Sequence, residues 1–354
     1  MSLRYNRKTT VIRLRVKSVL VRSRHALATG GQTFASFVDF SQENPMSVDP
    51  QVQVLIDALA EVGGARYIEM SAADARAWFS NFRRPFEVPI GHVEDRYIPG
   101  PGGDIPVRLY TPAEAKPAPL PALVYYHGGG WVVGDLESHD PLCRSLANAS
   151  GCKVVATDYR LAPEHPWPAA PDDCLAALHW VVDKASSIGV DSNRIAVGGD
   201  SAGGNLAAAV TQRVRTANGP NIRFQLLIYP ALDASMGLAS IDANAVGYFL
   251  EKAGMEWFYG HYVPDNADIK HPDISPLFAS DLSGLPPAYV VTAGHDPLCD
   301  EGRAYAAKLK SAGVPVEDAH YASMIHGFFG FQATVDVSRE AVRDAAQALA
   351  RALA

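Results

Sequence analysis

The chain has few cysteines, few charged residues and no long apolar run. Its four cysteines, Cys143, Cys152, Cys174 and Cys299, form no Cys-x-x-Cys pair, which argues against structural zinc and favours reduced, partly buried thiols. No stretch approaches the roughly 20 consecutive apolar residues of a membrane span. The net charge of −7 disfavours nucleic acid as a partner. Apolar side chains are plentiful, since 48% of the 354 residues are hydrophobic, and they can fill a large core.

Charge is distributed unevenly along the chain. Residues 1–45 hold eight basic and two acidic side chains, a net charge of +6, which leaves −13 for the remainder. This segment lacks the uninterrupted apolar stretch of a signal peptide, although its arginine-rich, acid-poor composition is shared by transit peptides. We interpret residues 1–45 as a mobile basic extension, with a targeting or membrane-surface segment as the alternative. We therefore expect a cytoplasmic protein.

The pentapeptide Gly-Asp-Ser-Ala-Gly at 199–203 has Ser201 at its centre. It stands between a short apolar stretch at 194–198 and a helical pattern at 204–210. A serine on a sharp turn from strand to helix exposes its hydroxyl, and flanking glycines tolerate the backbone strain. Ser201 is therefore a candidate nucleophile, and a glycine-rich turn with a solvated serine is the alternative. The choice depends on a base, an acid that orients the base, and donors for an oxyanion.

A run of glycines follows the earlier strand-like stretch 123–126. The sequence there is His-Gly-Gly-Gly-Trp at 127–131, and consecutive glycines let backbone N–H groups turn toward a ligand. Loops of this type form part of the oxyanion hole of lipases and esterases, where the remaining donor is the N–H after the nucleophile, here Ala202. A flexible loop or a phosphate-binding turn is the alternative, although no Lys-Ser/Thr pair follows the glycines. We interpret His127 as the anchor of this loop.

The acid is expected after the strand-like stretch 288–293. Asp296 follows it immediately and would lie at the carboxyl edge of a parallel sheet, where active-site residues of such sheets gather. Asp300 and Glu301 are competing carboxylates, but they are placed like the first turn of the next helix, where acids favour the helix dipole.

The base is expected last, after a final strand at 316–321. His326 is the candidate, while His320 lies inside that strand and His295 adjoins the proposed acid. The resulting chain order of serine, aspartate and histidine is the one that α/β-hydrolases use. Because His326 must be neutral to act as a base, activity is expected to fall on acidification from roughly pH 8 to pH 5.

These motifs resemble those of the bacterial hormone-sensitive lipase family of esterases, in the branch whose pentapeptide reads Gly-Asp-Ser-Ala-Gly. The resemblance covers about residue 46 to the end. The segments that carry it are 127–131, 158–164, 199–207, 296–298 and 326–328.

The resemblance implies roles for individual residues. The nucleophile would be Ser201, the orienting acid Asp296 and the base His326. Gly129 and Gly130 would face the oxyanion together with Ala202. The implied activity is hydrolysis of small-molecule esters with short- to medium-chain acyl groups, with no metal and no organic cofactor. Members of the family often pair through the last edge strand, here 316–321, so a homodimer is a further expectation.

The alternation of strand and helix patterns predicts an α/β-hydrolase fold, with a mostly parallel eight-stranded sheet, flanking helices and a helical cap. Residues 91–354 are expected to form the catalytic domain, 46–90 the N-terminal part of the cap, and about 233–273 its second segment. Helices are expected at 51–61 and 72–82, and strands at 93–98, 105–110, 122–126, 153–157, 194–198, 224–229, 288–293 and 316–321.

Other interpretations stay open at this point. An amidase, deacetylase or peptidase of the same fold would use the same residues, because the pocket selects the leaving group. A non-catalytic receptor is a third class: plant gibberellin receptors resemble this family but lack the histidine, whereas His326 is present here. Arg160 is interpreted as part of an ion pair or hydrogen-bonded network that holds the loop 161–168, with a clamp for a substrate carboxylate as the alternative.

Overall fold

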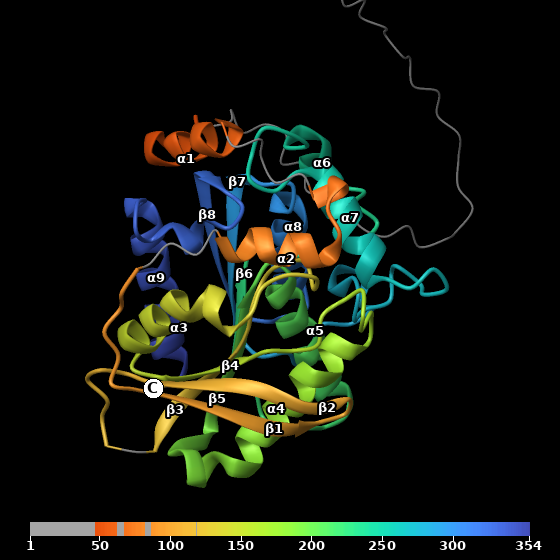
Figure 1. Cartoon of the computed structure of the whole chain (residues 1–354). Coiled ribbons are helices and arrows are strands. Elements are labelled where there is room, and N and C mark those ends of the chain that lie inside the picture. The colour runs from red at the N-terminus through yellow and green to blue at the C-terminus, as the bar shows by residue number, and fades with distance from the viewer. Residues whose placement is uncertain (1–46, 62–66, 82–85, 118) are drawn as a thin grey trace, which may run out of the picture. The chain divides into compact units, whose positions relative to one another are not determined.

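A sheet of eight strands runs through the fold (Figure 1). The computed structural model describes residues 47–61, 67–81, 86–117 and 119–354, so the predicted extension at 1–45 lies outside the described residues. Across the sheet, in order, lie β1 (His92–Gly100), β2 (Gly103–Thr111), β4 (Lys153–Thr157), β3 (Leu120–Tyr126), β5 (Val190–Asp200), β6 (Phe224–Ile228), β7 (Ala288–His295) and β8 (Val316–Ile325). The β1–β2 and β2–β4 pairs are antiparallel and the other pairs are parallel.

The predicted fold class, a mostly parallel eight-stranded sheet flanked by helices, is confirmed, and the differences lie at strand ends. The segment 324–325, which lies beyond the predicted strand 316–321, forms the buried end of β8. The reason is that β7 continues past a register shift to His295, which pairs with Ile325 and so keeps the backbone of both strands in the ladder. The loop that carries His326 therefore begins directly at the end of β8.

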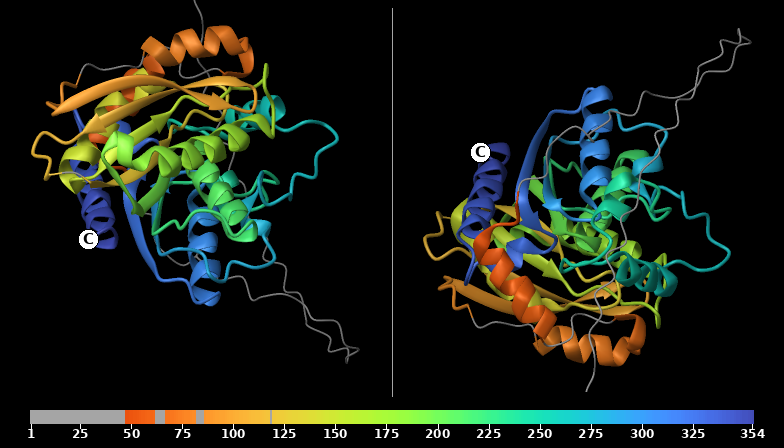
Figure 2. Two further views of the ribbon diagram at one scale, coloured as in Figure 1. Left: turned by 90° about the horizontal axis from the view of Figure 1, so that it is seen from below. Right: turned by 90° about the horizontal axis from the view of Figure 1, so that it is seen from above.

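Helices cover both faces of the sheet (Figure 2). One face carries α3 (Leu136–Ser150) and α9 (Asp336–Ala352), and the other carries α4 (Ala169–Lys184), α5 (Ala202–Thr216) and α8 (Cys299–Ser311). Successive side chains of a strand point to opposite faces. In β3, Val124 and Tyr126 therefore join the core that includes α4 and α5, while Leu123 and Tyr125 join the core that includes α3 and α9.

Further helices lie in the two segments expected to form a cap. They are α1 (Pro50–Glu61), η1 (Tyr67–Glu69) and α2 (Ala72–Asn81) in the first segment, and α6 (Ala239–Ala243) and α7 (Lys252–Tyr262) in the second. The Tyr67 ring lies 4.7 Å from that of Phe258 and 5.7 Å from that of Trp257. These contacts join two segments that are far apart in the sequence. The remaining short helices are η2 (Ala185–Ile188), η3 (Pro276–Phe278) and η4 (Phe328–Phe331).

Three general features bear on the sequence predictions. All four cysteines lie within the described residues, where each is buried and none forms a disulfide. No helix in the described ranges is long and apolar enough to cross a bilayer. Among the same residues, no three or more His, Cys, Asp or Glu side chains are grouped to hold a metal ion.

The strand register places the functional loops side by side. Tyr126 at the end of β3 pairs with Gly199 near the end of β5, and Asp200 of β5 pairs with Ile228 at the end of β6. The carboxyl ends of parallel strands share one edge of a sheet, which is where ligands bind in open α/β folds. The glycine loop after β3 and the serine turn after β5 are therefore neighbours.

Candidate active site

Ser201 forms a strained turn between β5 and α5. Its backbone has φ 56° and ψ −118°, a conformation that typically costs a non-glycine residue about 1–3 kcal/mol. Hydrogen bonds on both sides hold it there: its N–H donates to Ile228 O at 2.8 Å, and its carbonyl accepts from Ala231 N–H at 3.2 Å. The predicted strand-to-helix serine turn is therefore present in the structure.

Ser201, His326 and Asp296 form a continuous hydrogen-bonded chain. The Ser201 Oγ lies 2.9 Å from His326 Nε2, and His326 Nδ1 lies 2.7 Å from Asp296 Oδ2. The Asp296 carboxylate fixes the imidazole tautomer that donates from Nδ1, so Nε2 is free to accept the serine proton. The structure thus brings together the predicted nucleophile, acid and base, from the ends of β5, β7 and β8.

Two contacts hold Asp296 and His326 in this arrangement. Asp296 is completely buried, and its Oδ1 accepts the Leu298 N–H at 2.8 Å, so both carboxylate oxygens are used. The ring of Tyr229 lies 4.8 Å from the His326 ring and packs against it. Acid and base are therefore fixed by neighbours as well as by each other.

The competing histidines have different partners. His320 Nδ1 lies 2.9 Å from Thr292 Oγ1 within the β7–β8 ladder, and His295 Nδ1 lies 3.1 Å from the Tyr248 hydroxyl. The predicted choice of His326 over these two agrees with the hydrogen bond to Ser201.

The competing carboxylates lie in the first turn of α8, as expected. Asp300 accepts the Ser240 N–H at 2.8 Å, and Glu301 accepts the Leu232 N–H at 2.5 Å. Both acids therefore bind backbone around the site, whereas Asp296 binds the histidine.

The glycine loop presents unused N–H groups. Gly129 and Gly130 have φ values of +118° and +58°, which turn the chain sharply after β3. Among the hydrogen bonds of the described residues, none uses the N–H of Gly129, Gly130 or Ala202. Ala202 is also the first residue of α5, where the helix dipole favours negative charge. These three groups are the predicted oxyanion donors.

His127 anchors the loop, in agreement with its predicted role. Its Nδ1–H donates to Gly128 O at 2.8 Å, and the Tyr159 hydroxyl donates to its carbonyl oxygen, also at 2.8 Å. Burial, followed by the positive charge of nearby His139, lowers the pKa of His127 to about 4. A neutral residue held both at its ring and at its backbone carbonyl suits an anchor.

Arg160 is part of an ion pair, as the preferred interpretation predicted, but its partner was not foreseen. Its Nε and Nη2 each lie 2.8 Å from the oxygens of Asp173, a fully buried carboxylate of α4. The Asp173 carboxylate also accepts the Arg160 N–H at 3.0 Å. This bidentate contact ties the segment after β4 to α4.

A cavity of about 520 Å³ opens over the serine. Ser201, His326 and the three predicted oxyanion donors line it. The remaining lining is mainly apolar, and part of it comes from α1, η1, α7 and the loops beside them: Leu55, Ile56, Leu59, Tyr67, Phe249, Leu250, Met255 and Phe258. Such a site accepts a small molecule with apolar groups on both sides of a polar centre.

Comparison with known proteins identifies the fold family. A family model described as the alpha/beta hydrolase fold matches residues 123–330. The chain belongs to the α/β-hydrolase fold family. The resemblance to hormone-sensitive-lipase-like esterases that the motifs indicated is thereby confirmed.

Three relatives illustrate this membership. Carboxylesterase NlhH of Mycobacterium tuberculosis is 42% identical over 315 residues, covering 86% of this chain and 96% of the relative. Ethyl acetate hydrolase of Pseudomonas putida is 42% identical over 252 residues, covering 70% of this chain and 79% of the relative. The crystal structure of an α/β-hydrolase enzyme from the metagenome of Lake Arreo, Spain, is 44% identical with a TM-score of 0.82, covering 86% of this chain and 98% of that one.

Sequence reasoning missed several groups around the site. In the sequence, Asp200 only indicated the branch of the family. In the structure, its carboxylate accepts the Gly128 N–H at 3.0 Å. His139 and Arg76 were not singled out, although His139 lines the cavity and Arg76 binds the carbonyl of Val132 beside the glycine loop. The position of Asp200 inside the pentapeptide was the one signal that could have identified it.

Proposed function

We propose that this protein is a serine carboxylesterase that hydrolyses small acyl esters through an acyl-enzyme intermediate. The observation that carries the proposal is the hydrogen-bonded chain from Asp296 through His326 to Ser201, which lines a mainly apolar cavity. Relatives named as a carboxylesterase and an ethyl acetate hydrolase support the same reaction class.

In the first half of the reaction, His326 Nε2 takes the proton of Ser201 Oγ while that oxygen attacks the ester carbonyl carbon. The carbonyl oxygen becomes negatively charged, and the N–H groups of Gly129, Gly130 and Ala202 stabilise it; one such donor typically contributes about 3–4 kcal/mol. The tetrahedral intermediate collapses when His326 gives its proton to the leaving alcohol. The acyl group then remains bonded to Ser201.

Water completes the cycle by the same route. His326 takes a proton from a water molecule, whose oxygen attacks the acyl carbon, and the same N–H groups hold the second oxyanion. The bond to Ser201 Oγ breaks as His326 returns the proton to that oxygen, and the carboxylic acid leaves. Asp296 stabilises the imidazolium at each stage. These steps use only groups of this chain, the ester and water.

The cavity supports short- to medium-chain acyl esters over long-chain triglycerides. Its volume of about 520 Å³ lies in the range of small-molecule sites. We propose that residues 46–90 and about 233–273 act as a cap over the catalytic domain 91–354, since Tyr67 and Phe258 from these segments line the cavity and touch each other. An apolar roof of this kind excludes water from the acyl-enzyme until the alcohol has left.

Replacement of the nucleophile tests this function. Ser201→Ala should lower kcat for p-nitrophenyl acetate and butyrate by roughly 10⁴-fold or more, because no other group can form the acyl-enzyme. The control is Ser187→Ala, which removes a hydroxyl that donates to Lys184 O on an exposed turn, and it should leave turnover unchanged. Matching anilides measured beside the esters separate an esterase from an amidase. Full ester turnover by Ser201→Ala would refute the proposal.

Location and assembly belong to the same proposal. We propose a cytoplasmic enzyme that forms a homodimer through β8, because β8 is an edge strand of the sheet and one side of its backbone is unpaired within the described part of the chain. Light scattering after size-exclusion chromatography measures the mass directly, and a monomer at micromolar concentration would contradict the dimer.

A further inference from the structure

A buried pair of charged side chains contacts the first peptide of the glycine loop and has no part in the proposed proton transfers. Asp200 is the last residue of β5 and is 7% exposed, and His139 comes from the first turn of α3 and is 9% exposed. His139 Nε2 lies 3.3 Å from Asp200 Oδ1 and 3.4 Å from Oδ2. Buried charges destabilise the fold unless they are paired and hydrogen-bonded. The burial of these two side chains beside the glycine loop therefore needs a structural or functional explanation.

Asp200 holds the first peptide of the glycine loop. Its Oδ1 accepts the Gly128 N–H at 3.0 Å and the Tyr125 hydroxyl at 2.6 Å. The fit is close, because a Cβ on Gly128 would overlap the Asp200 carboxylate. The residue directly before Ser201 is therefore bonded to the residue directly before Gly129. This contact fixes the distance between the nucleophile and two of the three proposed oxyanion donors.

His139 is held in turn by the start of α3. Its Nδ1 lies 3.0 Å from Ser138 Oγ. Ser138 forms a capping box with Asp135, in which the Asp135 carboxylate accepts the Ser138 N–H at 2.7 Å and the Ser138 hydroxyl accepts the Asp135 N–H at 2.9 Å. The first turn of α3 is therefore fixed by its own cap.

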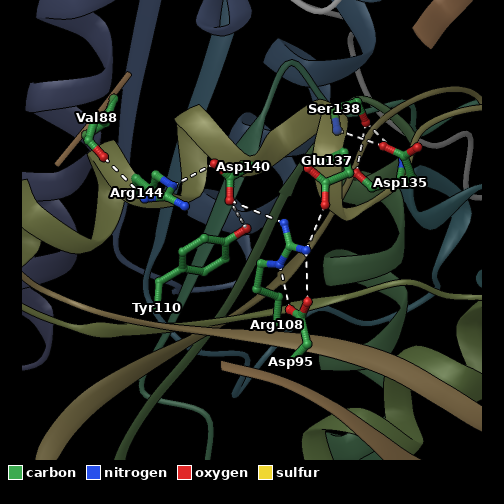
Figure 3. Close-up of polar contacts among 9 residues, drawn as sticks. All are labelled: Val88, Asp95, Arg108, Tyr110, Asp135, Glu137, Ser138, Asp140 and Arg144. Carbon is green, nitrogen blue, oxygen red and sulfur yellow. Dashed lines mark hydrogen bonds and ion pairs between the residues drawn. The ribbon is translucent and has the colours of Figure 1, made fainter. Parts of the chain in front are cut away.

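A side chain of the antiparallel strand β2 also contacts the first turn of α3, as Figure 3 shows. Arg108 of β2 donates to Glu137 at 2.7 Å and to Asp95 of β1 at 2.6 Å, and it lies 3.4 Å from Asp140. Tyr110 donates its hydroxyl to Asp140 at 3.1 Å. These contacts join β1, β2 and α3, so His139 is presented to Asp200 from a fixed helix.

The surroundings favour the charged forms of both partners. Burial alone would raise the pKa of Asp200, but the charge and hydrogen bond of His139 hold it below its usual value. Burial alone would lower the pKa of His139, but the Asp200 carboxylate raises it above its usual value. The other titratable groups that face the pair are Tyr125 and Tyr229, Cys143, Asp135 and the neutral His127.

We propose that Asp200 and His139 are positioning residues for the oxyanion hole. Asp200 fixes the peptide that begins the loop, and His139 keeps the Asp200 carboxylate ionised and oriented. The proposal rests on the proposed function, since it assigns the pair to the oxyanion donors Gly129 and Gly130. Such donors act over a narrow range of about 2.7–3.1 Å from the developing oxyanion. A loosened loop therefore lowers kcat, whereas KM, which reports ground-state binding in the apolar cavity, changes little.

Two replacements of Asp200 separate positioning from general stability. Asp200→Ala removes the acceptor, and it should lower kcat for p-nitrophenyl butyrate by roughly 10²–10³-fold, as the loss of one oxyanion donor does. Asp200→Asn keeps an oxygen that can accept the Gly128 N–H, and it should recover at least roughly tenfold of that loss. Inactivation by a p-nitrophenyl phosphonate, whose phosphoryl oxygen occupies the oxyanion hole, should slow in parallel with kcat. KM should stay within about threefold in both variants.

The matched control is Asp173→Asn, which alters another buried, ion-paired aspartate that does not line the cavity. It should lower the thermal midpoint without lowering kcat per folded enzyme. If Asp200→Ala does not fold, His139→Gln serves as the second variant, and it should lower kcat by roughly tenfold with KM unchanged. A folded Asp200→Ala or His139→Gln enzyme with wild-type kcat and phosphonylation rate would overturn this proposal while leaving the proposed function intact. A wild-type protein that hydrolyses no ester would instead contradict the proposed function.

Discussion

At the scale of single residues, the strained turn at Ser201 is held by the glycines on either side of it. A Cβ on Gly199 or on Gly203 would overlap the carbonyl oxygen of Tyr126 at the end of β3. The missing side chains let β3, β5 and α5 approach closely enough to keep Ser201 in its unfavourable conformation. The strain is therefore supported by packing around the turn, as expected of a residue with a specialised role.

Glu301 is a second residue whose environment has a measurable consequence. Its Oε1 accepts the N–H groups of Leu232 at 2.5 Å and Asp233 at 3.3 Å. Burial raises the pKa of Glu301 well above its usual value, so the folded protein keeps this proton to a higher pH than the unfolded chain does. The unfolded chain releases this proton near pH 4.5, and the folded state therefore binds more protons above that pH.

Glu301→Gln should remove this pH dependence. The wild-type free energy of unfolding falls as the pH rises above the unfolded pKa, by up to about 1.4 kcal/mol per pH unit until the folded pKa is reached. A glutamine side chain does not titrate, so the variant should gain stability relative to wild type between roughly pH 5 and pH 8, measured by urea denaturation. Glu340→Gln on the exposed face of α9 is the control and should show no such gain. Equal pH slopes for Glu301→Gln and wild type would contradict the raised pKa of Glu301.

At the residue scale, the sequence predicted best which side chains come together when short motifs directly follow strands. Ser201, Asp296 and His326 each follow a strand, so linear patterns placed them together before the structure did. Asp173 and His139 were missed because their partners lie far along the chain and only packing brings them close. Motifs made of residues adjacent in the sequence give no information about such long-range contacts.

At the scale of elements, Arg76 fixes α2 beside the glycine loop. Its Nε donates to Val132 O at 2.8 Å, and its Nη2 donates to Ala162 O at 2.8 Å. The guanidinium also binds both oxygens of Glu164, at 2.9 and 2.6 Å, and these hydrogen bonds lower the pKa of Glu164 to about 2. This ion pair of Arg76 with Glu164, the Arg76 clamp, therefore persists throughout the pH range of an esterase assay. It holds one proposed cap helix against the catalytic domain.

Arg76→Gln should loosen α2 and weaken substrate binding. We expect KM for p-nitrophenyl butyrate to rise roughly three- to tenfold with a smaller change in kcat, because the cap helix moves while the triad keeps its own contacts. Arg96→Gln is the matched control: it breaks the ion pair of Arg96 with Glu94 inside β1 and should leave both constants unchanged. Unaltered KM in Arg76→Gln would show that α2 does not depend on this clamp.

Element positions followed well from sequence, and element ends followed less well. Each strand of the sheet overlaps a strand predicted from sequence, and the buried parallel strands β3 and β6 are nearly continuous apolar runs. The end of β8 at Ile325 was missed, because its pairing with β7 resumes after a register shift that the local sequence does not indicate. Helices α1 and α2 start within one residue of the predicted positions.

At the scale of the whole molecule, the order of the strands in the sheet could not be predicted from the sequence patterns. Alternating strands and helices predicted a mostly parallel sheet, but they did not predict that β4 lies between β2 and β3. That order depends on which faces pack together over long distances in the chain. It is nevertheless what brings the loops after β3 and β5 side by side, and so what assembles the site.

The basic segment 1–45 gives a prediction at the same scale. Among the residues that the structure describes, the groups assigned to the site, the cavity and its supports lie between residues 55 and 334. A chain that begins at Met46 should therefore keep kcat/KM and the thermal midpoint of the full chain, with kcat/KM changed by no more than about twofold. Both proteins can be compared in one assay. A large loss of kcat/KM on truncation, on the order of tenfold, would give the basic segment a direct part in activity.

Active-site labelling tests the central claim most directly. The protein, with Ser201→Ala beside it, is treated with a fluorophosphonate and digested, and the adduct is located by mass spectrometry. Reaction requires a nucleophile activated by its base and oriented toward oxyanion donors, so it reports the assembled site and not merely an exposed hydroxyl. We predict one adduct, on Ser201, and none on the variant. An adduct on another residue, or equal labelling of the variant, would contradict the account.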